Sequence, residues 1–342
     1  MTPAAFCDTR FCSAVFDCLQ QERLLAGVTH AVLAVSGGLD SMVLLDFFRR
    51  FGAKKYGLQL TIAHLDHGLR PESAADACWL HDFCQTARLA FYSERVEVRQ
   101  QQALSAQSSL EAVARELRYD WLGSLASQCG AHAVLTAHTA SDQLETVLMR
   151  WIRGSISGLQ GMAPRRPLSE GSPVQLLRPL LGLTRPQLAA YASAHRLSWR
   201  EDASNQDPAF FRNRLRQDLI PLLLAENPRL AEQVSLQSEI WRAEQDWLRA
   251  QAQAHFAQLV QHSPEGLRLP VKPLLALPLA LQRCLLREVL TQQGEWKRYS
   301  TRHLEDLRAL AAGPGQKELH LPGGRCVRKS SQHLLFLDTD AG

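Results

Sequence analysis

The order of apolar strands and helical segments predicts a parallel β-sheet in the first half of the chain. Residues 31–35 form an unbroken apolar run, which is typical of a strand buried on both faces. Further strands are predicted over 60–65, 91–98, 133–137 and 174–179. Apolar residues at helical spacing separate the strands, for example between Leu110 and Leu125. Strand and helix in alternation indicate a doubly wound, Rossmann-like parallel sheet.

The second half of the chain has a different pattern. A helix is predicted over 210–224, with Pro221 expected to kink it. Three long helical segments follow, over 229–260, 279–293 and 300–312. Residues 317–337 are β-like, with Pro322-Gly-Gly324 as a turn. We therefore expect an α/β domain, an all-α domain and a short β-like tail, over 1–218, 219–312 and 313–342 respectively.

Three segments do not fit the α/β pattern. Residues 1–30 predict a short amphipathic helix that leads into the first strand. Residues 100–107 are polar and are expected to form a loop. The segment from Arg153 to Pro173 is rich in Gly, Pro, Arg and Ser, and we expect it to be either a lid or a linker.

Composition narrows the classes of protein that need to be considered. The 342 residues suit two domains, and 46% hydrophobic residues support real cores. No apolar run is long enough to span a membrane, and the N-terminus lacks a basic segment followed by an apolar one. The eight cysteines are scattered, with no Cys-x-x-Cys pair, which argues against a zinc or iron–sulfur site or a disulfide scaffold. We expect a cytoplasmic protein with reduced thiols and no membrane partner.

The positive charge is concentrated in one segment. Between Arg150 and Arg216 there are eleven arginines, no lysine and four carboxylates, a net +7, so the remainder carries −3 of the total +4. A solvated polar connector would explain such a run without a ligand. Arginine binds phosphates and bases in bidentate fashion, however, so its exclusive use favours a polyanionic partner.

The candidate phosphate site is Ser36-Gly-Gly-Leu-Asp-Ser41, which lies between the first strand and a predicted helix. This geometry presents backbone N–H groups and a partial positive charge to an anion. The glycines allow close approach, the two serine hydroxyls can donate, and Asp40 is suited to hold Mg²⁺ against a phosphate. The alternative is a βα turn in which Asp40 or Ser41 only caps the helix. The Gly-Lys-Ser/Thr ending of a Walker A loop and the third glycine of a dinucleotide fingerprint are both missing.

Further carboxylates follow the fourth predicted strand. Asp142 and Glu145 come after Ala137-His138, at the start of a helix. Asp142 alone is explained equally well as a helix cap. Because parallel strands end at the same edge of a sheet, Asp142 and Asp40 together predict a magnesium site that bridges phosphates.

The loop Ser36–Ser41 resembles the PP-loop of the N-type ATP pyrophosphatases. Several other segments match one family of this class in order: His64–Ser73, Ser109–Tyr119, Ala137–Thr146, Arg153–Ser155, Glu201–Asn205 and Phe211–Arg216. Together these segments resemble the tRNA(Ile)-lysidine synthetases over essentially residues 25–220. The C-terminal region resembles this family only in its general type of structure.

The resemblance implies an ATP-dependent ligase that modifies tRNA. Such an enzyme adenylates the C2 oxygen of the wobble cytidine of tRNA(Ile) with a CAU anticodon. The ε-amine of free L-lysine then displaces AMP and forms lysidine. ATP and Mg²⁺ are implied as cofactors and the helical domain as a tRNA-binding region. The oligomeric state is left open, with a homodimer as one candidate.

The resemblance also assigns roles to individual residues. The ATP phosphates would be held by Ser36, Gly37, Gly38, Leu39, Asp40 and Ser41, and Mg²⁺ by Asp40 and Asp142. Glu145 would support the metal or receive the lysine amine. The cleft for cytidine and lysine would contain Glu111, Arg115, Arg118, His138 and Arg153, although Glu111 and Arg115 could merely form an i,i+4 ion pair. Arg212 and Arg214 would neutralise the leaving AMP or contact the anticodon backbone. An acidic residue often stands in the family where this chain has Ser141, so a third carboxylate ligand is not expected.

Three other functions compete with this interpretation. A PP-loop tRNA thiolase would need a sulfur relay from paired or reactive cysteines. An amide-forming synthetase of the same loop class would usually add a glutaminase or a large substrate domain. A nucleotide- or RNA-binding protein without turnover would not need carboxylates at two strand ends.

Overall fold

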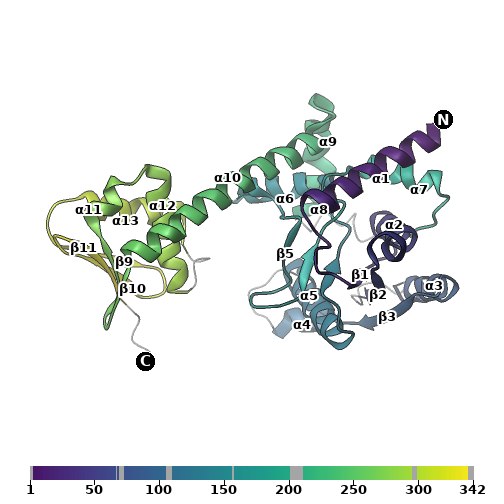
Figure 1. Ribbon diagram of the computed structural model, residues 1–342, viewed down its shortest axis with the longest axis horizontal. Helices are drawn as coiled ribbons and strands as arrows, with labels where there is room; N and C mark the ends of the chain where they lie inside the picture. The colour runs from purple at the N-terminus through teal and green to yellow at the C-terminus, as the bar shows by residue number, and fades with distance from the viewer. Residues whose placement is uncertain are drawn as a thin grey trace. The chain divides into compact units, whose positions relative to one another are not determined.

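The computed structural model describes residues 3–66, 68, 73–104, 110–155, 158–200, 211–294 and 299–337 (Figure 1). The chain divides into two compact units. The first comprises Met1–Arg150 and Gln160–Ser238, and the second comprises Trp151–Leu159 and Glu239–Gly342. None of the described helices is both long and apolar enough to cross a membrane.

The first unit is built on a six-stranded sheet with the order β3-β2-β1-β4-β6-β5. Its strands are β1 (His30–Ala34), β2 (Gln59–Asp66), β3 (Ala90–Arg95), β4 (Ala133–Leu135), β5 (Arg165–Pro167) and β6 (Gln175–Leu177). All neighbouring strands are parallel except β5 and β6, which are antiparallel. The predicted doubly wound parallel sheet is therefore confirmed.

Helices flank this sheet. In chain order they are α1 (Pro3–Gln21), α2 (Leu39–Tyr56), α3 (Ser73–Thr86), α4 (Val98–Leu104), α5 (Leu110–Gln128), α6 (Ala140–Ile152), α7 (Arg185–Ala194), α8 (Phe211–Arg214) and α9 (Ile220–Glu226). A π-helical segment, η3 (Leu215–Leu219), joins α8 to α9. The helix α10 (Leu230–Leu259) begins in the first unit and ends in the second.

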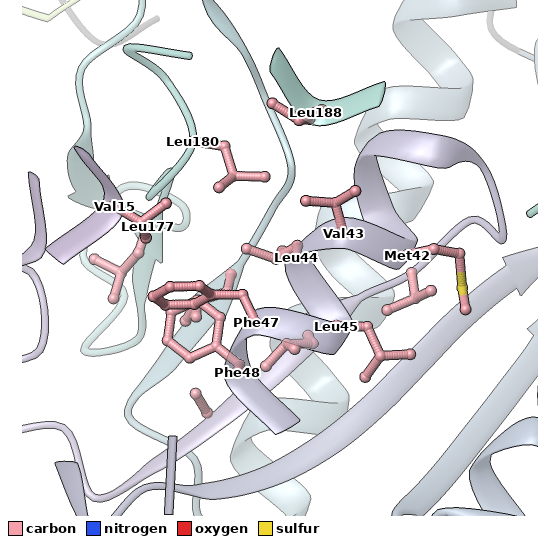
Figure 2. Packing of buried hydrophobic residues seen from close by; sticks show 14 of the residues in the cluster. Val15, Met42, Val43, Leu44, Leu45, Phe47, Phe48, Leu177, Leu180 and Leu188 are labelled. Carbon is pink, nitrogen blue, oxygen red and sulfur yellow. The ribbon is translucent and has the colours of Figure 1, made fainter. Parts of the chain in front are cut away.

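Strand β1 is buried on both faces, as its apolar run predicts. Its residues Ala31 and Leu33 belong to a cluster with α1, α2 and α7, whereas Val32 packs into a separate cluster with α5. Figure 2 shows side chains of α2, among them Leu44 and Phe47, packed with Leu177 and Leu180. The strand therefore ends in a rigid, fully packed region, and the loop that follows it starts from a fixed position.

The second unit contains a five-stranded antiparallel sheet with the order β7-β8-β11-β10-β9. Its elements are β7 (Gln261–Ser263), β8 (Gly266–Pro270), α11 (Val271–Ala276), α12 (Leu279–Gln292), α13 (Thr301–Ala312), β9 (Lys317–Leu321), β10 (Arg325–Lys329) and β11 (His333–Leu337). Leu285 of α12 and Leu307 of α13 are fully buried in one cluster with Phe336 of β11. The strands expected as a tail thus belong to the same core as these helices, together with two strands that the periodicity did not predict.

Several local expectations differ from the structure. The helix α4 occupies much of the polar segment expected as a loop, because Val98 is fully buried and the Gln-rich residues after it favour helix. The expected lid or linker contains a 3₁₀ turn, η1 (Gly158–Gln160), and the edge strand β5. The helix expected over 210–224 contains the π segment η3, with Ile220 N–H donating to the Leu215 carbonyl, shortly before Pro221. Ser109, the first residue of one segment that carries the family resemblance, lies outside the described residues, as does the segment Glu201–Asn205.

The start of α6 is anchored by a buried glutamine. The Gln143 amide is fully buried, donates to the Met162 carbonyl at 3.0 Å and accepts from the Met162 N–H at 2.5 Å. The chain can approach this closely because Gly161 has φ +56° and no side chain; a Cβ there would lie 2.5 Å from the Gln143 Oε1. Since Asp142 and Glu145 flank Gln143, this contact fixes the helix that carries them.

The substitution Gly161→Ala should therefore lower the free energy of unfolding by about 2–4 kcal/mol, because it adds a steric clash to the cost of a left-handed alanine. Gly130→Ala is the matched control: Gly130 has φ +65° and open space around its Cβ position. The substitution Gly130→Ala should lower the free energy of unfolding by only about 1 kcal/mol. Urea denaturation of both variants measures the difference. Equal losses would show that the Gln143 contact does not hold α6 in place.

Candidate functional site

The candidate site lies where the strand order of the first sheet reverses. Strands β1 and β4 are parallel neighbours at its centre. The chain leaves β1 toward α2 and leaves β4 toward α6, so the two connecting loops are neighbours at the carboxyl ends of the strands. Open α/β sheets bind their ligands at such a switch point. The motif Ser36–Ser41 occupies one of these loops, and Thr136–Asp142 occupies the other.

The loop after β1 is shaped by its two glycines and two serines. Gly37 has φ +86°, and a Cβ there would lie 3.7 Å from the Trp79 ring. The Ser41 hydroxyl donates to the Gly38 carbonyl at 2.9 Å and accepts from the Ser36 N–H at 3.2 Å. Leu39 is buried in the core and anchors the beginning of α2. These contacts hold an exposed Ser36 and the first N–H groups of α2 at the open edge of the sheet.

Asp40 does not cap its helix. The N-cap of α2 is Gly38, without a side-chain hydrogen bond, and the Oδ1 atom of Asp40 is buried with no hydrogen-bond partner. Burial, together with the negative charges of Asp142 and Glu145, raises the pKa of Asp40 to about 6, although Arg185 and Arg216 oppose the shift. A buried carboxylate oxygen without a partner, beside two other acids, is the environment that a cation would relieve.

Asp142 has both a structural and an electrostatic role. Its Oδ2 accepts from the N–H and the hydroxyl of Thr139, each at 2.9 Å, which forms a capping box at the start of α6. Its Oδ1 accepts from Arg212 at 3.0 Å. Burial alone would raise the pKa of Asp142, but Arg212, His138 and the Thr139 hydrogen bonds together lower it below its usual range. Asp142 is therefore ionised at neutral pH while one of its oxygens is fixed by the helix cap.

Glu145 is held by two arginines from the helix that begins at Phe211. Only 3% of its side chain is exposed. Its Oε2 accepts from Arg212 Nε at 2.6 Å, and its Oε1 accepts from Arg216 Nε at 2.7 Å. Arg212 also lies 3.8 Å from Glu111. Two guanidinium groups thus balance the acids of α6. Glu111 pairs with Arg212, and not with Arg115 in the i,i+4 ion pair that was the alternative explanation for these two residues.

His138 follows β4 at the same edge. Its Nδ1 lies 2.9 Å from the Thr136 hydroxyl. Burial, reinforced by Arg178, Arg115 and Arg212, lowers the pKa of His138 to about 3, although Asp142 opposes the shift. The imidazole is therefore neutral at physiological pH.

The structure brings together most of the residues that the sequence singled out. Asp40, Asp142, Glu145, Arg212, Glu111 and His138 form one electrostatically connected cluster. Arg115 and Arg118 lie beside Tyr119 on α5, close enough to lower its pKa against the opposing effect of burial. Arg214 is exposed beside Phe211, and Arg153 belongs to the second unit.

Two arginines of the site were not predicted. Arg216 pairs with Glu145, and Arg185 lowers the pKa of Asp40 by its charge. The signal for Arg216 was present in the sequence: Arg212 and Arg216 are four residues apart, which places them on one face of a helix. Arg214 is two residues from each of them, a spacing that does not place side chains on the same face of a helix.

The acids of the cluster suit a divalent cation. Mg²⁺ is usually bound through one or two carboxylates together with substrate phosphates. Asp40 supplies a buried oxygen without a partner, and its pKa responds to Asp142, so the two carboxylates are near each other. The residues present therefore fit Mg²⁺ beside the phosphate loop.

Comparison with known families matches the two units separately. A model described as a PP-loop domain matches residues 14–223. A model described as a TilS substrate binding domain matches residues 269–335. The first match includes every residue of the cluster. The second includes β9, β10, the last two residues of β8 and the first three residues of β11.

The chain is similar to several proteins named tRNA(Ile)-lysidine synthase. It is 39% identical to that of Thermus thermophilus over 93% of this chain, and spans only 59% of the relative's length. It is 33% identical to the Nostoc sp. protein, covering 93% of this chain and 94% of the relative. It is 34% identical to the Synechococcus sp. protein, covering 98% of both.

A solved structure supports the fold. The chain superposes on the U34-tRNA thiolase NcsA from Methanococcus maripaludis with a TM-score of 0.55. The match covers 68% of this chain and 78% of the thiolase at 13% identity. At this identity the likeness concerns the fold alone.

The raised pKa of Asp40 predicts a pH-dependent effect of Asp40→Asn on stability. In the unfolded chain the carboxyl ionises near its model value of 3.8, whereas in the folded protein it ionises near 6. The ionised carboxyl of Asp40 therefore destabilises the folded protein. This cost in stability is absent below about pH 4 and reaches its full size above about pH 6. Without metal or nucleotide, the variant should match the wild type at pH 4 and exceed it by about 1–3 kcal/mol at pH 7.

Urea denaturation in the presence of a chelator, at a series of pH values, measures this difference. Asp17→Asn provides a control, since Asp17 is an exposed acid on α1. A wild type that is as stable as Asp40→Asn at pH 7 would show that the Asp40 carboxylate is solvated or paired in the folded protein.

Proposed function

The chain belongs to the tRNA(Ile)-lysidine synthase family of PP-loop proteins, and on this premise we propose that it joins free L-lysine to a tRNA cytidine. The RNA substrate is tRNA(Ile) with a CAU anticodon, and the site of attachment is C2 of its wobble cytidine. ATP is converted to AMP and pyrophosphate, so the enzyme is a ligase that forms a C–N bond. These substrates occur together in the cytoplasm, where we expect the protein to act, with a homodimer as its candidate assembly.

One observation carries the proposal: an exposed, glycine-shaped loop lies beside a buried and incompletely satisfied carboxylate at the switch point of the sheet. The donors that the loop can offer to phosphates are the first N–H groups of α2, which begins at Leu39, and the hydroxyl of the exposed Ser36. The carboxylate of Asp40 offers an oxygen to a cation. A site that binds phosphate and a cation together is suited to splitting ATP.

In the first step, the C2 oxygen of cytidine attacks the α-phosphorus of ATP, and the bond to pyrophosphate breaks. Negative charge accumulates on the departing pyrophosphate. The N–H groups at the start of α2 and the hydroxyl of Ser36 lie where they can bind that charge. Asp40 and Asp142 would hold Mg²⁺, which supplies additional positive charge to the phosphate oxygens.

In the second step, the lysine ε-amine attacks C2, and the C2–O bond breaks so that AMP leaves with the oxygen. The amine must first lose a proton, because its pKa in water is about 10.4. The acids of α6 are suited to bind the ammonium and to accept or relay this proton. Glu145 is shielded by Arg212 and Arg216, so these arginines must turn aside, toward the phosphate of the AMP group, before Glu145 can receive the amine.

The competing functions have less support. A sulfur-transferring enzyme needs a reactive thiolate, yet burial raises the pKa of the Cys84 thiol to about 11. A binding protein without turnover would have no need to bury Asp40 at an energetic cost beside Asp142. The catalytic proposal uses all of these features.

Mass analysis of the anticodon nucleoside, after incubation with ATP, tRNA and labelled lysine, tests the proposed function. The wild type should incorporate one lysine for each AMP and each pyrophosphate released. Asp40→Ala should abolish pyrophosphate release while the circular-dichroism spectrum remains that of the wild type. Pyrophosphate release by this variant at the wild-type rate, or an unmodified cytidine in the wild-type reaction, would contradict the proposal.

Glu145→Gln should separate the two steps. We expect pyrophosphate release to stay within about tenfold of the wild type, and lysidine formation to fall by about 10²-fold or more, the usual contribution of a group that handles a proton. Glu226→Gln is the control for charge, because Glu226 is exposed at the end of α9. Thermal melting identifies any loss of folding caused by leaving Arg212 and Arg216 without their carboxylate. Full lysidine formation with an ordinary KM for lysine would remove Glu145 from the second step.

A further inference from the structure

A second charged cluster lies beside the site, around Tyr119 of α5. The guanidinium carbon of Arg115 is 5.0 Å from the centre of the Tyr119 ring, and that of Arg166 is 5.3 Å from it. Together with Arg178, these two arginines lower the pKa of the Tyr119 phenol, even though burial acts in the opposite direction. We call these four residues, Tyr119, Arg115, Arg166 and Arg178, the arginine cage.

Arg178 is the innermost member of the cage. Only 1% of the residue is exposed, and its Nη1 donates to the Ala163 carbonyl at 2.5 Å. Its Nε is buried and has no hydrogen-bond partner. A buried donor of a charged group that lacks an acceptor is rare in native proteins, and it indicates a missing ligand or water.

The cage has no matching negative charge. In the described part of the chain, no carboxylate lies within ion-pair distance of Arg115, Arg166 or Arg178. The arginines of the neighbouring cluster behave differently, since Arg212 and Arg216 both pair with Glu145. The face of a phenol ring attracts each cation only weakly, so it does not replace an anion. The arrangement is that of a preformed anion-binding site.

The position of the cage relates it to the proposed reaction. Strand β6 is the parallel neighbour of β4, so Arg178, directly after β6, and His138, shortly after β4, lie at the same edge of the sheet. The phosphate loop follows β1, on the other side of β4. Two strand spacings separate β1 from β6, about 10 Å, which is too far for one ATP phosphate to contact both.

We propose that the arginine cage binds a backbone phosphate of the RNA substrate next to the nucleotide that enters the site. This inference rests on the proposed function, because it takes the RNA to be the second substrate. A phosphodiester is a permanent anion that arginine binds in bidentate fashion. Bound there, it would satisfy the Nε of Arg178 and neutralise the cage while the target base leaves its stack.

The test combines Arg166→Gln with RNA that lacks a single charge. The probe is an anticodon stem-loop RNA with a CAU anticodon, unmodified or carrying one neutral methylphosphonate at each phosphate that flanks the wobble nucleotide in turn. Arg165→Gln is the matched control: neighbouring residues of a strand face opposite sides, and Arg165 is exposed on the same strand, β5. Both variants remove one positive charge.

Arg166→Gln should weaken binding of the unmodified RNA by about tenfold. It should also reduce the slope of log affinity against log salt concentration by about the contribution of one phosphate contact. Arg165→Gln should change affinity less than about twofold. In the wild type, one methylphosphonate position should cause a loss of similar size to that of Arg166→Gln. In Arg166→Gln, the same RNA should show no further loss, because the contact is already gone.

Three outcomes overturn the proposal. If the loss of affinity from Arg166→Gln and the loss from a methylphosphonate add up at every phosphate position, the cage does not contact the flanking backbone. A raised KM for lysine with unchanged RNA affinity would assign the cage to the lysine carboxylate. Equal effects of Arg165→Gln and Arg166→Gln would reduce the cage to general surface charge. Failure of the proposed function is distinct, because the wild type would then form no lysidine on the unmodified RNA.

Discussion

The concentration of carboxylates at one edge of the sheet is the constraint on which the site depends. Asp40, Asp142 and Glu145 interact through a largely buried region, where like charges repel strongly. Arg212 and Arg216 compensate both oxygens of Glu145 and one oxygen of Asp142. Asp40 receives no such partner for its Oδ1. The folded chain thus neutralises most of this charge and leaves one carboxylate oxygen for a ligand that it does not itself supply.

This balance is assembled from segments far apart in the sequence. Arg212 lies 67 residues after Glu145 and reaches it through an irregular helix, in which the π segment η3 precedes Pro221. A π turn changes the angular spacing of side chains, and such turns are frequent at functional sites. The contact of Gln143 with Met162 fixes the other side of the pair. The position of the acids therefore depends on backbone irregularities at Gly161 and before Pro221 as much as on the sheet.

The sequence predicts the sheet and the two strand-end loops because these features are local. An apolar run buried on both faces and a glycine turn before a helix each have one physical explanation, and the structure agrees with both. The pairing of Arg216 with Glu145 requires the distance between two helices, which periodicity does not contain. The arginine cage was likewise not predicted, because Tyr119 lies on a helix, Arg166 on β5 and Arg178 just after β6, and only the fold brings these elements together. Strands β7 and β8 are short and lack a clear alternation, so the pairing of β8 with β11, which also brings β7 into the sheet, is a tertiary effect.

The two clusters are suited to substrate groups of opposite charge. The acids after β1 and β4 can attract cations, namely a metal and an ammonium group, whereas the arginine cage after β6 can attract an anion that is permanent. His138 lies between them and is kept neutral by burial and by the arginines. A neutral imidazole at this position neither attracts the phosphates nor repels the ammonium. A reaction that joins an amine to a polyanion needs both regions within reach of one nucleotide, and the adjacent parallel strands β4 and β6 provide that proximity.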